Sequence, residues 1–208
     1  MPIILFQGDS ITDTGRDRRS GDPNSASALG NGYPLIAASQ MLRAHPDSAL
    51  RIYNRGVSGD KVPALLARWE ADTIALKPDI LSILVGVNDL WHKLMGRYTG
   101  TVDEFESQYD ELIQRTKQAL PDVRLVMLEP FVLVTGAVDA NWFPEFDERR
   151  AAVARLAKRA GATLLPLQAM FTQLARSAPP SYWLADGVHP TIAGHAAIAE
   201  RWREAVGL

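Results

Sequence analysis

Residues 3–10 read IILFQGDS, an apolar run that passes directly into a glycine, an aspartate and a serine. A short apolar run that ends in turn-forming residues is typical of a buried β-strand. Four further short and mostly apolar runs follow along the chain, at 51–54, 80–85, 124–129 and 163–167. Strands that are apolar almost throughout, rather than at alternate positions, indicate a parallel sheet covered on both faces.

Stretches with helical periodicity separate these strands. In the clearest one, apolar residues recur three and four positions apart from Phe105 to Leu120. Thr101 and Glu104 are typical of a capping box at its start. Further helices are expected at 33–43, 62–76, 144–160 and 190–206, where prolines suit the first helical turn. The order βαβαβαβαβα predicts an α/β fold, a three-layer α/β/α sandwich around a five-stranded parallel sheet.

Length and composition favour one folded unit. The chain has 208 residues, of which 47% are hydrophobic and 22% charged, as in ordinary globular proteins. We therefore expect a single domain over residues 1–208. Because the sequence has no cysteine, disulfides, thiolate metal sites and thiol nucleophiles are excluded.

Net charge and hydropathy argue against some classes of binding partner. The 22 basic and 24 acidic residues give a net charge of −2, which offers no overall field for binding nucleic acid or an anionic membrane. No apolar run approaches the roughly 18 residues that a membrane helix needs. The first residues lack the basic segment of a signal peptide. We expect a cytoplasmic protein without a nucleic-acid or membrane partner.

Polar residues gather where the predicted strands end, which is where parallel sheets bind ligands. Glycine, asparagine and aspartate follow the second and third strands, in the stretches 54–56 and 86–89. Ser10 follows the first strand, and Gly8 allows a tight turn that leaves its hydroxyl exposed. Asp186 and His189 lie before the last helix. Each motif alone is an ordinary turn, so the inference depends on their joint placement.

Together these residues provide the parts of an acyl-transfer site. Ser10 is the candidate nucleophile, His189 the base that takes its proton, and Asp186 the carboxylate that orients the imidazole. Ser10, Gly56 and Asn88 are candidate donors to the oxyanion. Asp89 is expected to act as a structural cap or loop anchor, and His195, in the middle of a helix, fits a packing role better than that of the base.

In these residues the chain resembles the GDSL, or SGNH, hydrolase family. Its first, second, third and fifth sequence blocks match Gly8-Asp9-Ser10, Gly56, the stretch 86–89 and the stretch 186–190, in family order. The resemblance implies a flavodoxin-like fold, the triad and oxyanion donors named above, and catalysis without a cofactor or metal. Ile11 stands where the family name has leucine, a common variation.

Finer stretches at 54–59, 68–70, 88–91 and 128–131 are similar to a bacterial branch that includes intracellular acetylxylan esterases and carbohydrate deacetylases. This similarity implies removal of acetyl groups from sugar hydroxyls, for example on acetylated xylo-oligosaccharides, and assembly into a homo-oligomer. Candidate substrate contacts are aromatic residues of the expected loops: Trp91, Phe131, Trp142 and Trp183.

Two other functions stay open at this stage. One is a lysophospholipase, thioesterase or arylesterase of broad specificity within the same family. The other is a flavodoxin-like module without enzymatic activity, in which Ser10, Thr12 and Thr14 hold the phosphate of a cofactor. An ordinary α/β-hydrolase is disfavoured because the chain has no Gly-x-Ser-x-Gly motif, and a phosphatase of the Asp-x-Asp type because Ile11 follows Asp9 by two positions.

Overall fold

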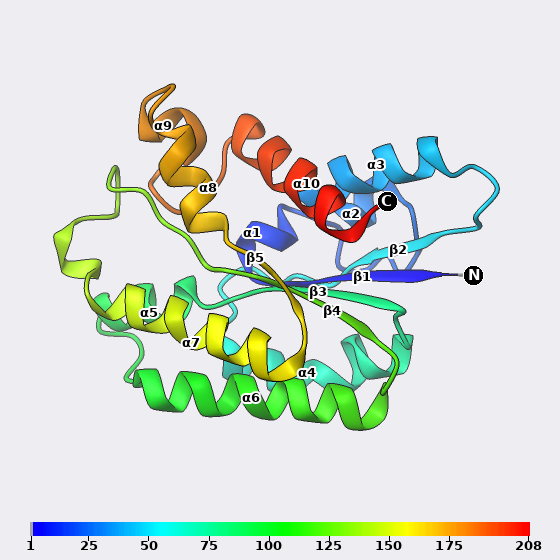
Figure 1. Cartoon of the computed structure of the whole chain (residues 1–208), viewed down its shortest axis with the longest axis horizontal. Coiled ribbons are helices and arrows are strands. Elements are labelled where there is room, and N and C mark those ends of the chain that lie inside the picture. The colour runs from blue at the N-terminus through cyan, green and yellow to red at the C-terminus, as the bar shows by residue number, and fades with distance from the viewer. Residues whose placement is uncertain (1) are drawn as a thin grey trace.

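Five parallel strands form the centre of the molecule in the computed structural model, which describes residues 2–208 (Figure 1). The strands are β1 (Ile3–Gly8), β2 (Arg51–Asn54), β3 (Ile80–Leu84), β4 (Arg124–Leu128) and β5 (Thr163–Leu165). Their order in the sheet is β2-β1-β3-β4-β5, and every neighbouring pair is parallel. The predicted five-stranded parallel sheet is confirmed.

Helices connect the strands. They are α1 (Ser10–Asp13), α2 (Ala26–Leu29), α3 (Tyr33–Ala44), α4 (Val62–Asp72), α5 (Val87–Leu94), α6 (Val102–Ala119), α7 (Glu145–Ala160), α8 (Leu167–Leu174), α9 (Pro180–Trp183) and α10 (Ile192–Val206). Short 3₁₀ turns lie at η1 (Ile74–Leu76) and η2 (Ala140–Trp142). Within residues 2–208, none of these helices has the length and apolar character to cross a membrane.

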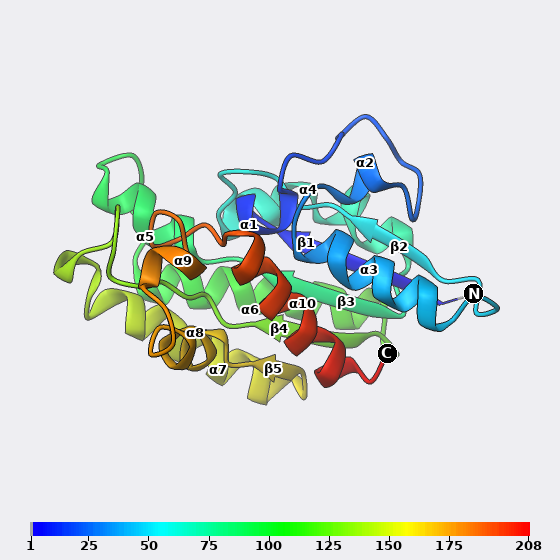
Figure 2. The ribbon, with the colours of Figure 1, turned by 90° about the horizontal axis from the view of Figure 1, so that it is seen from above.

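Helices cover both faces of the sheet and form the predicted three layers. In Figure 1, α3, α8 and α10 lie on one face, and α4, α6 and α7 on the other. Figure 2 shows α10 beside α3. Successive strand residues alternate between the layers: Ile4 and Phe6 belong to the first core and Leu5 to the second. The apolar character of both strand faces, read from the sequence, reflects these two cores.

Several helix limits differ from the expected ones. The helix expected at 62–76 is divided, because α4 ends before Thr73 and a 3₁₀ turn follows. The last helix begins at Ile192, not at Pro190, since the Thr191 side chain caps it by accepting from the Gly194 N–H. The short helices α1, α2, α5, α8 and α9 were not predicted, because only one to three turns carry no clear periodicity.

The strand order places a topological switch point beside β1. Helical connections leave β1 and β3 toward different layers, and the carboxyl ends of these two strands border the gap between them. Gly8 ends β1 with φ of 155°, and a Cβ there would lie 2.2 Å from the Leu84 carbonyl oxygen of β3. Only glycine therefore fits where the chain turns toward Ser10.

Candidate active site

Ser10 is the first residue of α1, immediately beyond β1. The Asp9 carboxylate caps this short helix by accepting from the Ile11 N–H at 3.0 Å. The Ser10 side chain is half-buried and lies 2.9 Å from Nε2 of His189. The serine hydroxyl and the imidazole, 179 positions apart in the sequence, are therefore within hydrogen-bonding distance.

His189 and Asp186 lie on the loop between α9 and α10. An antiparallel bridge between Leu184 and Pro190 closes this loop, and Ala185 N–H donates to the His189 carbonyl at 2.8 Å. Nδ1 of His189 lies 2.7 Å from Oδ2 of Asp186. Serine, histidine and aspartate thus form a continuous hydrogen-bonded chain, the arrangement that acyl transfer by a serine requires.

Backbone donors hold the Asp186 carboxylate in its charged form. Its Oδ1 accepts from the N–H groups of His189, at 2.7 Å, and Val188, at 2.9 Å. Partial burial acts to raise the pKa of Asp186, but the hydrogen bonds from His189 and Val188 outweigh burial and place this pKa below its ordinary value. An ionised Asp186 favours the tautomer of His189 that carries its proton on Nδ1, which leaves Nε2 free to accept from Ser10.

Asn88 lies at the start of α5, just beyond β3, and not in an extended loop as its turn-forming neighbours indicated. Its side-chain amide donates to the carbonyl of Asp60 at 3.1 Å. An amide nitrogen carries two protons, so one N–H remains for a ligand. Asp89, the next residue, accepts from the Val62 N–H at 3.2 Å and so fixes the start of α4, which confirms its expected structural role.

Gly56 does not fit the predicted role of an oxyanion donor. Its N–H donates to Oδ1 of Asn54 at 2.9 Å, so this donor is already used. A Cβ at position 56 would lie 2.5 Å from the backbone nitrogen of Asp13. The structure therefore assigns Gly56 to close packing of the loop against α1, and the prediction was wrong.

Gly59 is a candidate donor that the sequence analysis did not name. The loop after β2 crosses the site, since Val57 N–H donates to the Gly8 carbonyl at 3.0 Å and the Asp60 carbonyl accepts from Asn88. Gly59 lies between these two anchors with φ of +86°, and open space surrounds the position of a Cβ. In the described part of the chain its N–H has no acceptor. The second glycine in Asn54–Gly59 was the available signal.

Two buried carboxyl groups lie behind the nucleophile. Burial, with added repulsion from Asp89 and Asp60, raises the pKa of Asp9 to about 7. Burial likewise raises the pKa of Asp89 to about 6, against the opposing hydrogen bond from Val62. Burial thus favours the uncharged form of Asp9, which lies beside a site whose chemistry places negative charge on Asp186.

Two of the four candidate aromatic residues lie at the site. The Trp91 ring centroid is 5.7 Å from that of His189 and 5.8 Å from that of Trp142. Both tryptophans line a hollow of about 440 Å³, with Leu94, Met95, Ala137, Asp139 and Asn141. Leu94 and Met95 are 44% and 47% exposed, which is high for large apolar side chains.

The other two aromatic residues do not line this hollow. Phe131 is 0% exposed and packs against Phe171 with ring centroids 4.5 Å apart, so it is a core residue and its predicted substrate contact is wrong. Trp183 ends α9, where its ring packs against Tyr182 and its carbonyl accepts from the Thr191 N–H. These contacts support the loop that carries His189.

The remaining candidates have structural roles. His195 is buried and its Nδ1 accepts from the Tyr33 N–H at 3.2 Å; burial lowers its pKa to about 4, so it is neutral and already bonded. Thr12 is buried and bonded to the Tyr33 hydroxyl, and Thr14 accepts from the Asn31 N–H. These hydroxyls are used internally, which disfavours the phosphate-binding module. Among residues 2–208, no three His, Asp or Glu side chains are grouped to hold a metal ion.

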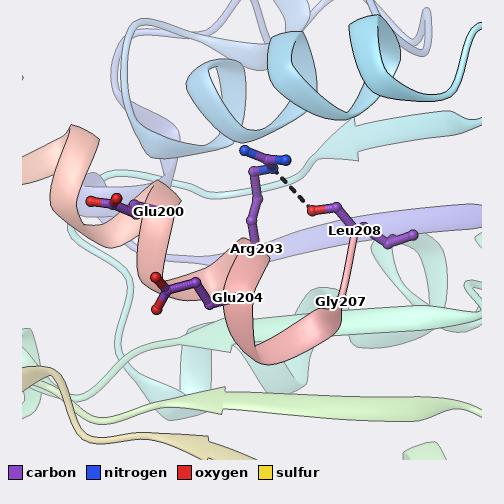
Figure 3. Close-up of a pocket in the computed structure, with 5 residues that line it drawn as sticks. All are labelled: Glu200, Arg203, Glu204, Gly207 and Leu208. Carbon is purple, nitrogen blue, oxygen red and sulfur yellow. Dashed lines mark hydrogen bonds between the residues drawn. The ribbon is translucent and has the colours of Figure 1, made fainter.

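A second hollow lies around the last turn of α10 (Figure 3). It is lined by the carboxyl end of α10 and the residues after it, and Arg203 donates to the Leu208 carbonyl there. Arg124, the first residue of β4, donates to the Val206 carbonyl nearby. This hollow is therefore beside the amino ends of the strands, whereas Ser10 lies beyond their carboxyl ends.

The fold and the site define a hydrolase of carboxylic esters that uses a serine, with a parallel α/β/α architecture. Residues 6–197 match the model of the GDSL-like Lipase/Acylhydrolase family, and the chain belongs to this family.

Relatives agree with this assignment. An acetylxylan esterase from Geobacillus stearothermophilus is 33% identical over 98% of this chain and 93% of its own. A crystal structure described as a GDSL-like lipase from Parabacteroides merdae is 44% identical, covers 99% of this chain and 95% of its own, and has a TM-score of 0.96. The structure of Axe2, an acetylxylan esterase from Geobacillus stearothermophilus, is 31% identical over 100% of this chain and 94% of its own, with a TM-score of 0.88.

Proposed function

We propose that the protein is a serine esterase that removes acetyl groups from acetylated xylo-oligosaccharides through an acyl-enzyme. The observation that carries the proposal is the hydrogen-bonded chain from Ser10 through His189 to Asp186, with separations of 2.9 and 2.7 Å. The names of the acetylxylan esterase relatives supply the choice of acetyl group and sugar.

In the proposed reaction, Nε2 of His189 takes the Ser10 proton while Oγ attacks the ester carbonyl. Protonated His189 then donates to the leaving sugar oxygen, and the acetyl group stays on Ser10. Water repeats the sequence on the acyl-enzyme and releases acetate. Asp186 stabilises the imidazolium that forms in each half-reaction, and needs no proton itself.

The oxyanion is held by three donors: the N–H of Ser10, the N–H of Gly59 and the remaining amide N–H of Asn88. Gly59 replaces Gly56 in this proposal because the Gly56 N–H is bonded to Asn54. Each such donor contributes about 2.7–4 kcal/mol to transition-state stabilisation in serine hydrolases.

The hollow beside His189 supports a sugar as the leaving group. Aromatic rings stack on sugar faces, and Trp91 presents such a ring next to the imidazole that protonates the leaving oxygen. Asp139 and Asn141 on the rim can bond sugar hydroxyls. A purely apolar acyl channel for long fatty chains would not need these polar groups, which makes the lysophospholipase, thioesterase or arylesterase of broad specificity the second candidate.

Hydrolysis assays test the proposal. We expect the protein to cleave p-nitrophenyl acetate much faster than the octanoate, and to release acetate from acetylated xylo-oligosaccharides. Ser10→Ala should abolish both activities, whereas Ser39→Ala, at an exposed position of α3, should leave them unchanged. Preference for octanoate would favour the second candidate, the family member of broad specificity, and full activity of the Ser10→Ala variant would reject the proposed nucleophile.

Two further expectations stay predictions: a cytoplasmic location and assembly into a homo-oligomer. Sedimentation of the purified protein would measure its assembly.

A further inference from the structure

Arg16 is a buried cation without an acidic partner. The residue is 7% exposed, and its Nε donates to the Gly56 carbonyl at 2.9 Å. Within residues 2–208 the rest of its guanidinium has no acceptor, and Nη1 is fully buried. Burial lowers the pKa of Arg16, and nearby guanidinium groups add to this effect against the attraction of Asp13. A buried charge without a counter-ion is unfavourable for folding.

Further cations surround Arg16. It lines a hollow of about 400 Å³ together with Arg18, Arg19 and Arg55, in a lining completed by Ser20, Gly21, Val57, Ala71 and Asp72. Four arginines against one aspartate make this a strongly basic hollow on a protein whose net charge is −2.

Not all of these charges are available to a ligand. Arg18 is paired with Asp13, and Arg19 with Asp17 at 3.1 Å. Asp72 is paired with Arg68 at 3.0 Å, which reduces its effect on the hollow.

Arg55 differs from its neighbours. Its guanidinium stacks on the Tyr53 ring at 5.7 Å, and in the described residues it has no carboxylate partner. Its Nη2 lies 4.0 Å from where a Cβ of Gly21 would be, so the Gly21 backbone lies beside it. Arg16 and Arg55 are therefore two uncompensated guanidinium groups that share one hollow.

We propose that this hollow binds a small oxyanion, a phosphate or carboxylate group, between Arg16 and Arg55. Guanidinium groups bind such oxyanions with paired, charge-assisted hydrogen bonds, and burial strengthens these bonds. The site is distinct from the esterase site, because Ser10, Asp186 and His189 are not among the residues that line the hollow. The ligand would supply the counter-ion that Arg16 lacks.

Titration of the full-length protein with sodium phosphate tests the site, with calorimetry and the melting temperature as readouts and with ionic strength held constant by sodium chloride. We expect saturable binding and a rise in melting temperature. Glucuronate, which presents a carboxylate on a sugar, and glucose, its uncharged counterpart, are the comparison ligands. Binding of phosphate alone would indicate a free anion, and binding of glucuronate a carboxylate-bearing sugar; glucose should not bind.

Substitutions of Arg16 and Arg55 test whether these two side chains bind the anion. Arg55→Gln should weaken phosphate or glucuronate binding by about tenfold or more. Arg43→Gln, at an exposed position of α3, is the matched control and should bind as the parent does. Arg16→Lys, which keeps the charge but not the paired donors, should also weaken binding, and it provides a second variant if Arg55→Gln does not fold.

Equal shifts with sodium chloride, no binding of either anion, or equal binding by the Arg55→Gln and Arg43→Gln variants would overturn the proposal. Ser10→Ala should lose esterase activity and still bind the anion, so the test of this site is independent of the proposed function.

Discussion

The reactivity of Ser10 depends on a few contacts around it. The turn after β1 needs a glycine at position 8, because any side chain there would collide with the Leu84 carbonyl. The turn aims Ser10 Oγ at His189 Nε2, and the backbone donors of Val188 and His189 keep the third member, Asp186, ionised. Small polar contacts around the three residues thus prepare the site before substrate binds.

Asn88 offers the sharpest test of the oxyanion donors. Asn88→Ala should lower kcat on p-nitrophenyl acetate by about 10²–10³-fold with KM nearly unchanged, because its free N–H acts on charge that develops only in the transition state. Steady-state kinetics measure both constants. The matched control is Asn141→Ala on the rim of the hollow, which should alter KM for xylo-oligosaccharides instead. A change in KM alone for Asn88→Ala would remove it from the oxyanion site.

The raised pKa of Asp9 predicts how the stability of the protein depends on pH. Its pKa is about 7 in the folded protein against 3.8 as the reference value, so the folded state binds the proton more tightly. The stability contributed by this proton is present below about pH 4 and is lost as the pH rises toward 7 and beyond. Asp9→Asn, which stays neutral, should reduce the loss of stability between pH 5 and pH 8.

Urea denaturation at the two pH values measures this effect. Asp89 titrates in both proteins, so part of the pH dependence remains. Asp103→Asn, at an exposed position of α6, should leave the pH dependence as it is. If the Asp9→Asn variant and the parent lose the same stability over this range, Asp9 is ionised in the folded protein throughout.

At the residue level, the sequence predicted the serine, histidine and aspartate that the structure brings together, but its choice of Gly56 as a donor was wrong. Residue type and chain order reveal which side chains can do the chemistry. They do not reveal which backbone N–H groups are already bonded, as that of Gly56 is to Asn54. Likewise, Phe131 and Trp91 both follow strands, and only packing separates the core ring from the ring at the site.

The long helices have recognisable local causes. α6 begins with the predicted capping box, in which Thr101 accepts from the Glu104 N–H and Glu104 accepts from the Thr101 N–H. α7 ends at Gly161, whose φ of 64° suits glycine. Such caps, together with helical periodicity, made the long helices predictable from the sequence. The short apolar runs made all five strands predictable. Short helices such as α5 depend on their packing against other elements, which sequence periodicity does not reveal.

The capping box gives a prediction for α6. Thr101→Ala should reduce the free energy of unfolding by about 1 kcal/mol, because the Glu104 N–H loses its acceptor. Urea denaturation measures the change. Ser107→Ala, at an exposed position inside α6, is the control and should be neutral or slightly stabilising. Equal destabilisation by both substitutions would contradict a capping contribution.

For the molecule as a whole, stability comes from two cores that share one sheet. Adjacent residues of β4 belong to different cores: Met127 to the layer of α4, α6 and α7, and Leu128 to the layer of α3 and α10. Both are 0% exposed. Because the same strands carry both sets of side chains, loss of either core should be transmitted to the other.

Substitutions at these two positions test that connection and the predicted single domain. Met127→Ala and Leu128→Ala should each lower the free energy of unfolding by about 2–5 kcal/mol through loss of buried surface and creation of a cavity. Each variant should still unfold in one transition by both tryptophan fluorescence and circular dichroism. Two separate transitions in either variant would show that the layers unfold independently.

The distance in sequence between Ser10 and His189 also has a consequence for synthesis. A ribosome makes the proposed nucleophile 179 positions before the proposed base, so a growing chain carries an inert hydroxyl throughout that interval. Products of early termination, even long ones, would hold the serine without the imidazole and could not hydrolyse esters. Enzymatic competence is therefore gained in one step, when the loop that carries His189 has left the exit tunnel and closed against the sheet.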